Sequence, residues 1–561
     1  MRGVKFLGIA LAGLIGAIVV LLLLLWLFVN PNDYKGRIVQ TVRSATGREL
    51  ELPGDLKLSV FPWIALELGP ASLGNAPGFG TEPFAAVRHV AVRVKLLPLL
   101  RKRLRVVRLD IDGLDVRLHR NAQGQGNWQN FGGGNAAAPG AEPAESATAV
   151  LEDVSGVAIN DSRVSYEDTV ADQVNLTVGH VVAGASVPVT LKVNVLMSGG
   201  TRPIKIAAHG DLIYGENALH ATGLVVQLDD STLRGDAAIT DLDTKAIRFN
   251  LDLDHINVDR YLAAMRLERG KAPPPSEAKS AEPTSDVPQD LQVAGTIAIS
   301  SATIVGVTVT QVRANVATKE GVTRISPATA KLYGGSYSGD ITLDERGSSP
   351  ALKLDQSLTG VDVTLLLQDF AKLRRVSGRA NVTADLTAHG LASEEFIKSL
   401  SGRVNAYVAN GAIEGIDLWF EINRAIALLQ KQTLPAAKSS GRTTFDVFKA
   451  SAVVVNGVAT TKDLTIASQK LRVSGEGTTN LVNEAINYQI KATILKEVPT
   501  AKPAPEATLA EIPLTITGTL KSPEVSPNLQ ALAAARVQQE LEKHQGELQQ
   551  RLQDALKGLL K

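Results

Sequence analysis

Apolar and polar residues alternate with a period of two along most of this chain. Val90, Val92 and Val94 are interleaved with Arg93 and Lys95. Because successive side chains of a strand point to opposite faces, this period predicts β-strands with one aliphatic face and one wet face. The same alternation recurs in Val189, Leu191, Val193 and Val195, and later in Val382, Ala384, Leu386 and Ala388. Short strands at close spacing predict a mainly β fold built as a long, elongated antiparallel meander.

The apolar face of these strands is aliphatic. Hydrophobic residues make up 44% of the chain and aromatic residues only 4%, so Val, Ile, Leu and Ala dominate the lining. The 58 basic and 57 acidic residues nearly balance, which gives no indication of nucleic acid binding. The chain has no cysteine, which excludes disulfides, thiolate metal sites and cysteine nucleophiles.

A change of parity surrounds Gly113. Leu109 and Ile111 alternate with charged residues before the glycine, and Val116 and Leu118 continue the pattern after it in the opposite parity. A glycine at such a point predicts a β-bulge. We expect the aliphatic residues to line one continuous surface, for which the candidates are Val90, Val92, Val94, Leu109, Ile111, Val116, Leu118 and Leu191.

Residues 6–29 form an uncharged, largely apolar stretch near the N-terminus. At about 1.5 Å per residue it is long enough to span a bilayer core of about 30 Å. Arg2 and Lys5 precede it, so the positive-inside bias places residues 1–5 in the cytoplasm and the rest of the chain across the membrane. We predict an uncleaved single-pass anchor. The alternative is a cleaved signal peptide, whose apolar region is usually shorter and ends in a small-residue cleavage site.

Three low-complexity stretches divide the rest of the chain. They are rich in Gly, Ala, Pro or Glu and cannot bury enough apolar surface to order themselves, so we expect exposed loops or linkers. The predicted organisation is an N-terminal β region at 30–131, a flexible loop at 132–146, a central β region at 147–270, a Pro-rich linker at 271–289, and a C-terminal β region at 290–527 with a flexible loop at 497–510.

Three aspartates each follow the end of a strand-like stretch and open a helix-like one: Asp259, Asp362 and Asp417. An aspartate at this position accepts hydrogen bonds from the orphan N–H groups of the first helical turn, so we predict three structural N-caps. The alternative is that the three carboxylates gather in one functional site.

Residues 528–561 return to a helical period. Their apolar residues form one stripe from Val537 to Leu559, and the opposite face carries charges of both signs. The interpretations are an amphipathic helix that caps the sheet, one that contacts a partner, and one that lies on a membrane. The mixed charge favours the first two.

The sequence contains no convincing catalytic or metal-binding motif. The eight histidines show no metal-binding helical spacing. Asp252, Asp254 and His255 are close together, but the two aspartates fall on the polar face of a predicted strand. Ser276 and Lys279 match S-x-x-K within the Pro-rich linker, where no rigid site can be held. We therefore predict no catalytic residues, no metal, no cofactor and no enzymatic activity.

Several segments resemble the AsmA family. They are residues 29–34 after the apolar run, 46–50, 96–100, 411–417 and 512–523. Their order covers nearly the whole chain and implies an inner-membrane protein of Gram-negative type with its bulk in the periplasm. The family is similar to bridge-like lipid-transfer proteins, whose β segments form a long groove with an apolar floor. The resemblance implies phospholipid traffic that supports outer-membrane biogenesis and integrity, together with assembly or lipid-transport partners, and it supplies no catalytic residues.

The aliphatic face bears on function without the resemblance. If the sheet curls on itself, the face becomes a trough suited to phospholipid acyl chains, where each buried CH₂ contributes about 0.8 kcal/mol. If two such faces meet, they form a dry sandwich core. The residues alone leave both open, and the resemblance favours the groove. Two other functions stay open: a scaffold for outer-membrane proteins that recruits partners by exposed strand edges, and a periplasmic hydrolase.

Overall fold

The computed structural model describes residues 30–552 except 60–63, 96–103, 122–123, 130–150, 183, 199, 262–290, 348, 391–392, 431–437, 496–510 and scattered positions of the tail (529, 532, 535–536, 538–540, 542–543 and 551). The predicted anchor at 6–29 and the three predicted loops and linkers lie outside the described residues. Within the described part of the chain, no helix is both long and apolar enough to cross a membrane.

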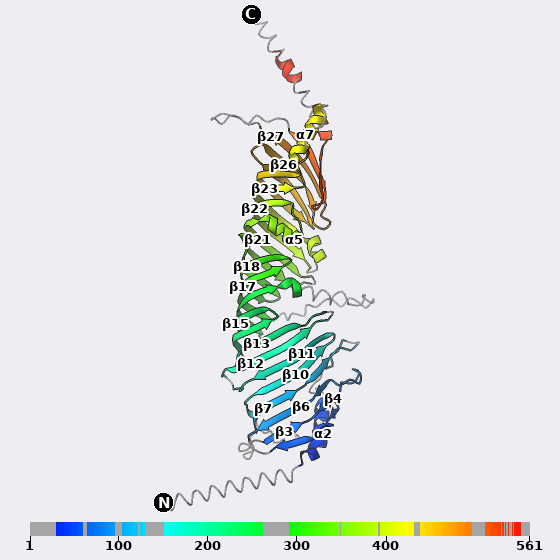
Figure 1. Cartoon of the computed structure of the whole chain (residues 1–561), viewed down its shortest axis with the longest axis vertical. Helices are drawn as coiled ribbons and strands as arrows, with labels where there is room; N and C mark the ends of the chain where they lie inside the picture. Colours follow the sequence, from blue (N-terminus) through cyan, green and yellow to red (C-terminus); the bar gives the residue numbers. More distant parts are fainter. Residues whose placement is uncertain are drawn as a thin grey trace, which may run out of the picture. The chain divides into compact units, whose positions relative to one another are not determined.

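The chain forms two compact units, one of residues 1–256 and 260–279 and the other of residues 257–259 and 280–561 (Figure 1). The first unit holds η1 (Pro31–Tyr34), α2 (Lys35–Thr46), β1 (Leu50–Glu51), β2 (Leu56–Ser59), β3 (Ile64–Leu68), β4 (Ala71–Leu73), β5 (Ala85–Val87), β6 (His89–Val94), β7 (Leu104–Asp112), β8 (Asp115–Leu118), β9 (Leu151–Val154), β10 (Val157–Tyr166), β11 (Thr169–Val178), β12 (Val187–Leu196), β13 (Ile204–Tyr214), β14 (Leu219–Leu228), β15 (Ser231–Asp241) and β16 (Ala246–Asn257).

The second unit consists of β17 (Gln292–Ile304), β18 (Val307–Lys319), β19 (Val322–Leu332), β20 (Gly335–Asp344), β21 (Ala351–Asp362), α5 (Val363–Ala371), β22 (Val376–His389), α6 (Ser393–Ser399), β23 (Ser401–Glu414), α7 (Leu418–Gln430), β24 (Arg442–Val455), β25 (Val458–Ala467), β26 (Leu471–Asn480), β27 (Ile486–Ile494), β28 (Ile512–Gly518) and β29 (Pro523–Pro527). Both units are mainly β, as the period-two alternation predicts.

Most neighbouring strands follow the predicted antiparallel meander. In the first unit β10 to β16 pair in sequence order, and in the second unit β17 to β29 do the same. The meander is interrupted at β10, which pairs in parallel with β7 and β8. A parallel neighbour needs a crossover connection, and the chain between β8 and β10 is long enough to supply one.

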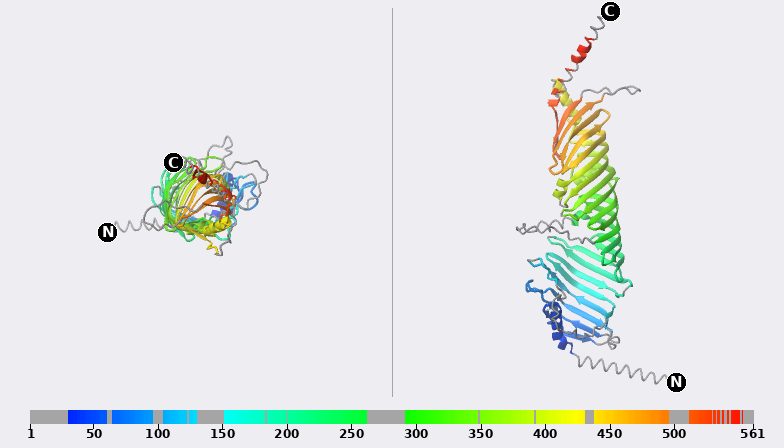
Figure 2. Two further views of the ribbon diagram at one scale, coloured as in Figure 1. Left: turned by 90° about the horizontal axis from the view of Figure 1, so that it is seen from above. Right: turned by 180° about the vertical axis from the view of Figure 1, so that it is seen from behind.

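β-bulges interrupt many of these pairs. Asp161, Gln173 and Gly223 have positive φ at register shifts of β10, β11 and β14. A polar side chain on the next strand supports such positions: the Asp161 N–H donates to Asn175 Oδ1 at 3.1 Å, and the Gly223 N–H donates to Asp236 Oδ1 at 3.0 Å. Because bulges increase local twist, they explain why the sheet of each unit curls (Figure 2).

Gly113 is one of these bulges. It has φ +65 and separates β7 from β8. The inserted residue restores the parity, so Val116 stays on the face that carries Leu109 and Ile111. A Cβ at Gly113 would lie 1.8 Å from Arg88 Nε, so the position requires glycine both for its conformation and for its space.

The largest buried core lies at the C-terminal end of the second unit. Strands β22 to β28 enclose one face of α7, and the shared core includes Leu418, Ile422, Ala425, Phe445, Ile466, Val473, Ile490 and Leu514. The side chains of Ile422, Ala425 and Val473 are fully buried. This part of the sheet therefore closes into a dry core, the arrangement that the sequence left open as the alternative to a groove.

The described part of the C-terminal tail includes helical residues 544–550. Its predicted apolar stripe is exposed to solvent at Val537, Leu541, Leu548 and Leu552. The interpretation of the tail as a helix that caps the sheet is therefore wrong for these four residues. Their exposure leaves the partner and membrane interpretations as predictions.

Candidate functional site

Cross-strand partners build a continuous aliphatic row across the first unit. Each member pairs with the next on the neighbouring strand, and the row consists of Leu68, Val90, Ile111, Ile159, Leu176, Leu191, Ala208, Val226, Leu233 and Leu253. Strands lie about 4.8 Å apart, so nine steps extend this aliphatic row over about 43 Å. It is the longest apolar feature that the pairing of the described strands defines in this unit.

The other candidates from the sequence lie beside this row. Val92 pairs with Leu66 and Leu109, and Leu109 aligns with Val157 of β10. Val94 pairs with Ile64 one step farther along the strands. Beyond the Gly113 bulge, Val116 aligns with Val164 and Leu118 with Tyr166. The structure thus brings Val90, Val92, Val94, Leu109, Ile111 and Leu191 onto one face and places Val116 and Leu118 farther along it.

The members of the aliphatic row are half-buried. All ten keep an intermediate exposure, whereas Val473 and Leu514 of the second unit are at most 1% exposed. Beyond Leu68 the pairing continues to Leu56 of β2, which is buried. The described helix α2 packs mainly against β1 and η1. The row is therefore a partly open apolar surface and not a sealed core.

Several members of the row were not singled out from the sequence. Ile159 and Leu176 lie on strands in which a bulge shifts the alternation, at Asp161 and Gln173. A positive-φ residue other than glycine gives no clear sequence signal, so the period-two pattern breaks without warning there. The asparagine that supports the first bulge, Asn175, is a weak local sign.

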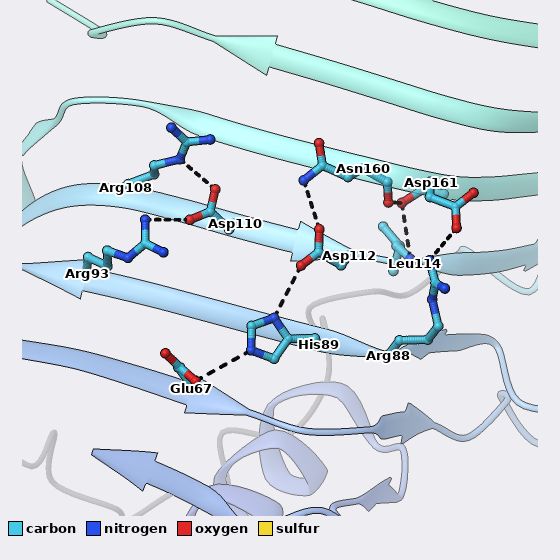
Figure 3. A network of polar contacts seen from close by, with 11 residues as sticks. Glu67, Arg88, His89, Arg93, Arg108, Asp110, Asp112, Leu114, Asn160 and Asp161 are labelled. Carbon is cyan, nitrogen blue, oxygen red and sulfur yellow. Dashed lines mark hydrogen bonds and ion pairs between the residues drawn. The ribbon is translucent and has the colours of Figure 1, made fainter. Parts of the chain in front are cut away.

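The opposite face of the same strands is charged (Figure 3). His89 lies between two carboxylates, with Nδ1 3.2 Å from Asp112 Oδ2 and Nε2 3.8 Å from Glu67 Oε2. The Asn160 amide donates to Asp112 Oδ1 at 2.8 Å. This hydrogen bond is the main cause of the lowered pKa of the Asp112 carboxyl, to which His89 and Arg88 add. The network joins β3, β6, β7 and β10 on the wet side of the sheet.

A second group in Figure 3 centres on Asp110. Its carboxylate accepts from Arg108 Nε at 2.6 Å, and Arg93 Nη1 lies 3.0 Å from it. Arg88 pairs with Asp161 at 2.5 Å, beside the bulge. Arg93 of β6 and Arg108 and Asp110 of β7 alternate with the aliphatic residues of these two strands. The charged and aliphatic faces are therefore separated by the pleat of the sheet, and the charges do not enter the row.

The structure assigns the acidic residues to structural positions. Among the described residues no group of three or more His, Asp or Glu could hold a metal ion. Asp254, one of the aspartates near His255, accepts from the Thr232 N–H at 2.7 Å across the β15–β16 pair.

Two of the three predicted N-cap aspartates occupy cap positions. Asp362 is the N-cap of α5 and accepts from the N–H groups of Thr364 and Leu365. Asp417 accepts from the Phe420 N–H at 2.9 Å at the start of α7, and its second oxygen accepts from Ser440. Burial acts to raise the pKa of Asp417, but these hydrogen bonds outweigh it and lower the pKa.

Asp259 differs from the prediction. It lies within the helical residues 258–261 instead of preceding them. Its carboxylate accepts from the N–H groups of Val305 at 2.6 Å and Gly306 at 2.7 Å, in the β17–β18 turn. The N-cap prediction is therefore wrong here, because a turn distant in sequence competes for the same carboxylate. Asp362 and Asp417 cap two different helices, Asp259 binds a turn, and the three carboxylates form no shared site.

The second unit has a comparable half-buried row before its closed end. Val316 pairs with Ile325, Ile325 with Ile341, Ile341 with Leu354, and Leu354 with Leu386. All five side chains keep intermediate exposure. Each unit thus has its own half-buried aliphatic row. In the second unit the next cross-strand partners after Leu386 are Gly402 and Val454, at the end of β23 and β24 that lies away from α7.

The sequence model of the AsmA family matches residues 1–198 and 205–464. Protein AsmA of Escherichia coli (strain K12) is 21% identical over an alignment of 531 residues, which covers 84% of this chain and 84% of that protein. No solved structure matches the chain significantly.

Proposed function

The chain belongs to the AsmA family, and from this premise we propose that it binds phospholipid by its acyl chains and transfers it along the aliphatic faces of its two units, in support of outer-membrane biogenesis and integrity. The observation that carries the proposal is the half-buried row from Leu68 to Leu253. A long apolar surface that stays partly open has no structural use as a core. It offers an acyl chain an environment close to that of the bilayer interior.

The energetics of such a surface suit transfer. An acyl chain in water loses about 0.8 kcal/mol for each exposed CH₂, so exposure of a whole chain is prohibitive. On an aliphatic face the chain exchanges lipid contacts for Val, Leu and Ile contacts of similar polarity. Movement along the row then costs little, because no member of the row is charged. A binding surface of this kind needs no catalytic group, and the proposed role is non-enzymatic.

The proposed location follows from the N-terminal sequence and the family. Residues 6–29 would anchor the protein in the inner membrane as a single pass, with residues 1–5 in the cytoplasm and the two β units in the periplasm. Donor lipid is then available at the anchored end.

Site-specific photo-crosslinking in the full chain tests the proposal. Leu191 belongs to the aliphatic row, and its neighbour Lys192 points to the wet face of the same strand and is exposed. A benzophenone amino acid at position 191 should capture phospholipid in intact cells, identified by mass spectrometry of the cross-linked peptide. The same probe at position 192 should capture little. Equal labelling at both positions, or none at 191, would contradict lipid binding by this face.

An assembly scaffold is the second candidate, and one observation favours it. Among the described strands β29 pairs only with β28, so no described strand pairs with its other edge, where a partner strand could add. Prolines at both ends of β29, Pro523 and Pro527, limit such pairing. Leu191→Asp separates the two functions, because a charge in the row should abolish lipid capture while leaving edge pairing at β29 intact.

A further inference from the structure

We propose that the second unit binds an extended polypeptide strand in a notch beside the first residues of β24. The notch is a short length of strand edge with a neighbouring strand on one side only, next to a hollow of about 400 Å³. It lies outside the half-buried rows of both units, so binding there is separate from lipid binding. Two observations support the proposal: the register of β24 with its neighbours, and the residues that line the hollow.

The strand edge follows from the pairing of β24. On one side, β23 pairs with β24 from its first residue, Arg442. On the other side, the pairing with β25 begins only at Val447. Residues 442–446 therefore have a strand on one side alone. Because the residues of an antiparallel strand direct their N–H and C=O groups to alternate sides, every second one of these residues directs both groups away from β23.

No described group takes the place of the missing neighbour. Apart from the ladder with β23, no hydrogen bond between described residues reaches the backbone of residues 443–446. Arg442, just before them, bonds the Ser440 hydroxyl through both its N–H and its C=O. Residues 438–457 contain no proline, in contrast to the edge of β29. The unpaired backbone groups are therefore available to a strand from outside the protein.

The hollow lies at this edge. Its lining includes Thr443 and Thr444, which are consecutive in the strand, so their side chains point to opposite faces of the sheet. A hollow that touches both residues faces the edge of β24. The rest of its lining comes mainly from the β25–β26 turn at residues 468–470 and from Trp419 of α7. An added strand would lie along residues 442–446, in line with β25.

Polar side chains around the hollow are not engaged within the described part of the protein. Trp419, Thr444, Asp446 and Gln469 line it, and none of the four side chains forms a hydrogen bond or ion pair with a described residue. All four residues are exposed, Trp419 at 45%. The indole can contact an apolar or aromatic side chain of an added strand, and the Asp446 carboxylate can pair with a basic one.

The protein side of the notch is preformed. The Leu418 N–H donates to Thr443 Oγ1 at 2.9 Å, and the Thr443 hydroxyl donates to the Ile416 carbonyl at 2.7 Å. Phe445 is 3% exposed and packs in the core around α7. These contacts fix the strand edge and the helix that carries Trp419, so binding requires no ordering of the site.

The chemistry of the edge selects a polypeptide over a lipid. An acyl chain would leave the unpaired N–H and C=O groups of β24 without partners, which is costly once water is displaced. The backbone of an extended peptide supplies donors and acceptors at the spacing of a strand, and its alternate side chains meet the residues around the hollow.

The first experiment tests whether the protein binds the peptide backbone. The probe is a fluorescent, end-capped peptide of about eight residues that alternates threonine and valine and includes one tyrosine and one lysine. Its anisotropy is measured with the full-length protein in nanodiscs of phosphatidylethanolamine and phosphatidylglycerol. Two analogues carry N-methyl groups on alternate residues, one set for each edge of the peptide.

Strand addition uses one edge of the peptide, so one analogue should bind about 10-fold more weakly and the other within about 2-fold of the parent peptide. This comparison needs no variant of the protein. Equal binding of the two analogues, or no binding of the parent peptide, would overturn the proposal.

The second experiment locates the peptide. Trp419→Ala removes the indole from the notch and should weaken binding about 5-fold. Leu418, 1% exposed, still holds the start of α7 in the core of this variant. Phe370→Ala is the matched control, because it removes an aromatic ring that is 60% exposed on α5 and does not line the hollow. Its affinity should stay within about 2-fold of the wild type.

A benzophenone in place of the peptide tyrosine maps the contact directly. Mass spectrometry should find its cross-links at residues 442–446 or 468–470. Cross-links in β29 would assign the peptide to the terminal strand edge and overturn the notch, as would a wild-type affinity in Trp419→Ala. Lipid capture at position 191 tests the proposed function separately and does not depend on either result.

Discussion

The half-buried row of the first unit and the closed core of the second have the same kind of sequence. Both are built from period-two strands with aliphatic side chains on one face, such as Ile159 in the row and Ile490 in the core. They differ in what meets that face. In the core, α7 supplies Leu418 and Ile422 from inside the curl, and the strands close around them. In the first unit α2 packs mainly against β1 and η1, and the side chains of the row remain half-buried.

The difference shows that the alternation of apolar and polar residues determines which side chains share a face, but not whether that face stays partly open or becomes a core. Strand periodicity tells which side chains share a surface, while openness depends on whether another element is placed against that surface. In this molecule one helix converts a potential lipid-binding face into a core. Of the two outcomes that the sequence left open, a closed core is present around α7, with a helix in place of a second sheet face, while the first unit keeps a half-buried aliphatic row.

Matched isoleucine truncations give the largest expected contrast. Ile490 is 2% exposed in the core, so Ile490→Ala should destabilise the second unit by about 2–5 kcal/mol through lost burial and a cavity. Ile159→Ala removes the same atoms from a strand of the open row and should cost about 1 kcal/mol. Amide hydrogen exchange of the strands on either side of each residue measures both effects. Equal losses of protection would mean that the row is as tightly packed as the core.

A smaller contrast concerns the bulge that keeps the row on one face. Gly113→Ala forces a side chain into a left-handed conformation and against Arg88, which pairs with Asp161, so we expect a loss of about 2 kcal/mol. Gly124 has φ +78 but open space around it, and Gly124→Ala should cost only about 1 kcal/mol. Thermal unfolding of both variants against the wild type checks the difference. The two variants would behave alike if the contact with Arg88 carried no penalty.

The aspartates show what could be predicted from the sequence and what could not. Asp362 and Asp417 have the same local signature, a carboxylate between a strand and an apolar helix, and both cap the helix that follows. Nothing in that signature tells that α7 enters a core while α5 stays at an edge, because the choice depends on strands that pack from far along the chain. The N-cap prediction for Asp259 is wrong for the same reason, because the groups that its carboxylate binds, the N–H groups of Val305 and Gly306, lie in a turn distant in sequence.

The aliphatic row shows the same division. Val90, Val92, Val94, Leu109 and Ile111 were predictable because β6 and residues 108–112 of β7 alternate strictly up to a glycine, which marks its own bulge. The strands after them carry bulges at Asp161 and Gln173, where no glycine signals the change of parity. The parallel pairing of β10 with β7 was not predictable from periodicity, because it joins segments separated by a long connection.

The smallest expected effect concerns the wet face behind the row. The hydrogen bond from Asn160, with help from His89 and Arg88, lowers the pKa of Asp112 below its ordinary value, so folding favours the charged carboxylate. A group with a lowered folded pKa contributes stability above its unfolded pKa of about 3.9, and that contribution is lost as the pH falls through the folded pKa.

Asp112→Asn should therefore lower the thermal unfolding temperature slightly at pH 7 and flatten its dependence on pH below about 4, relative to the wild type. Asp115 lies on the same side of the sheet, paired with Arg117 at 3.0 Å and outside the contacts between Asp112, His89 and Asn160. Asp115→Asn is therefore the control variant, measured under the same conditions. An unchanged slope in Asp112→Asn would mean that the network on the wet face forms without a charged Asp112. Lipid capture at position 191 should be the same in both variants, because the pleat separates the charged face from the aliphatic row.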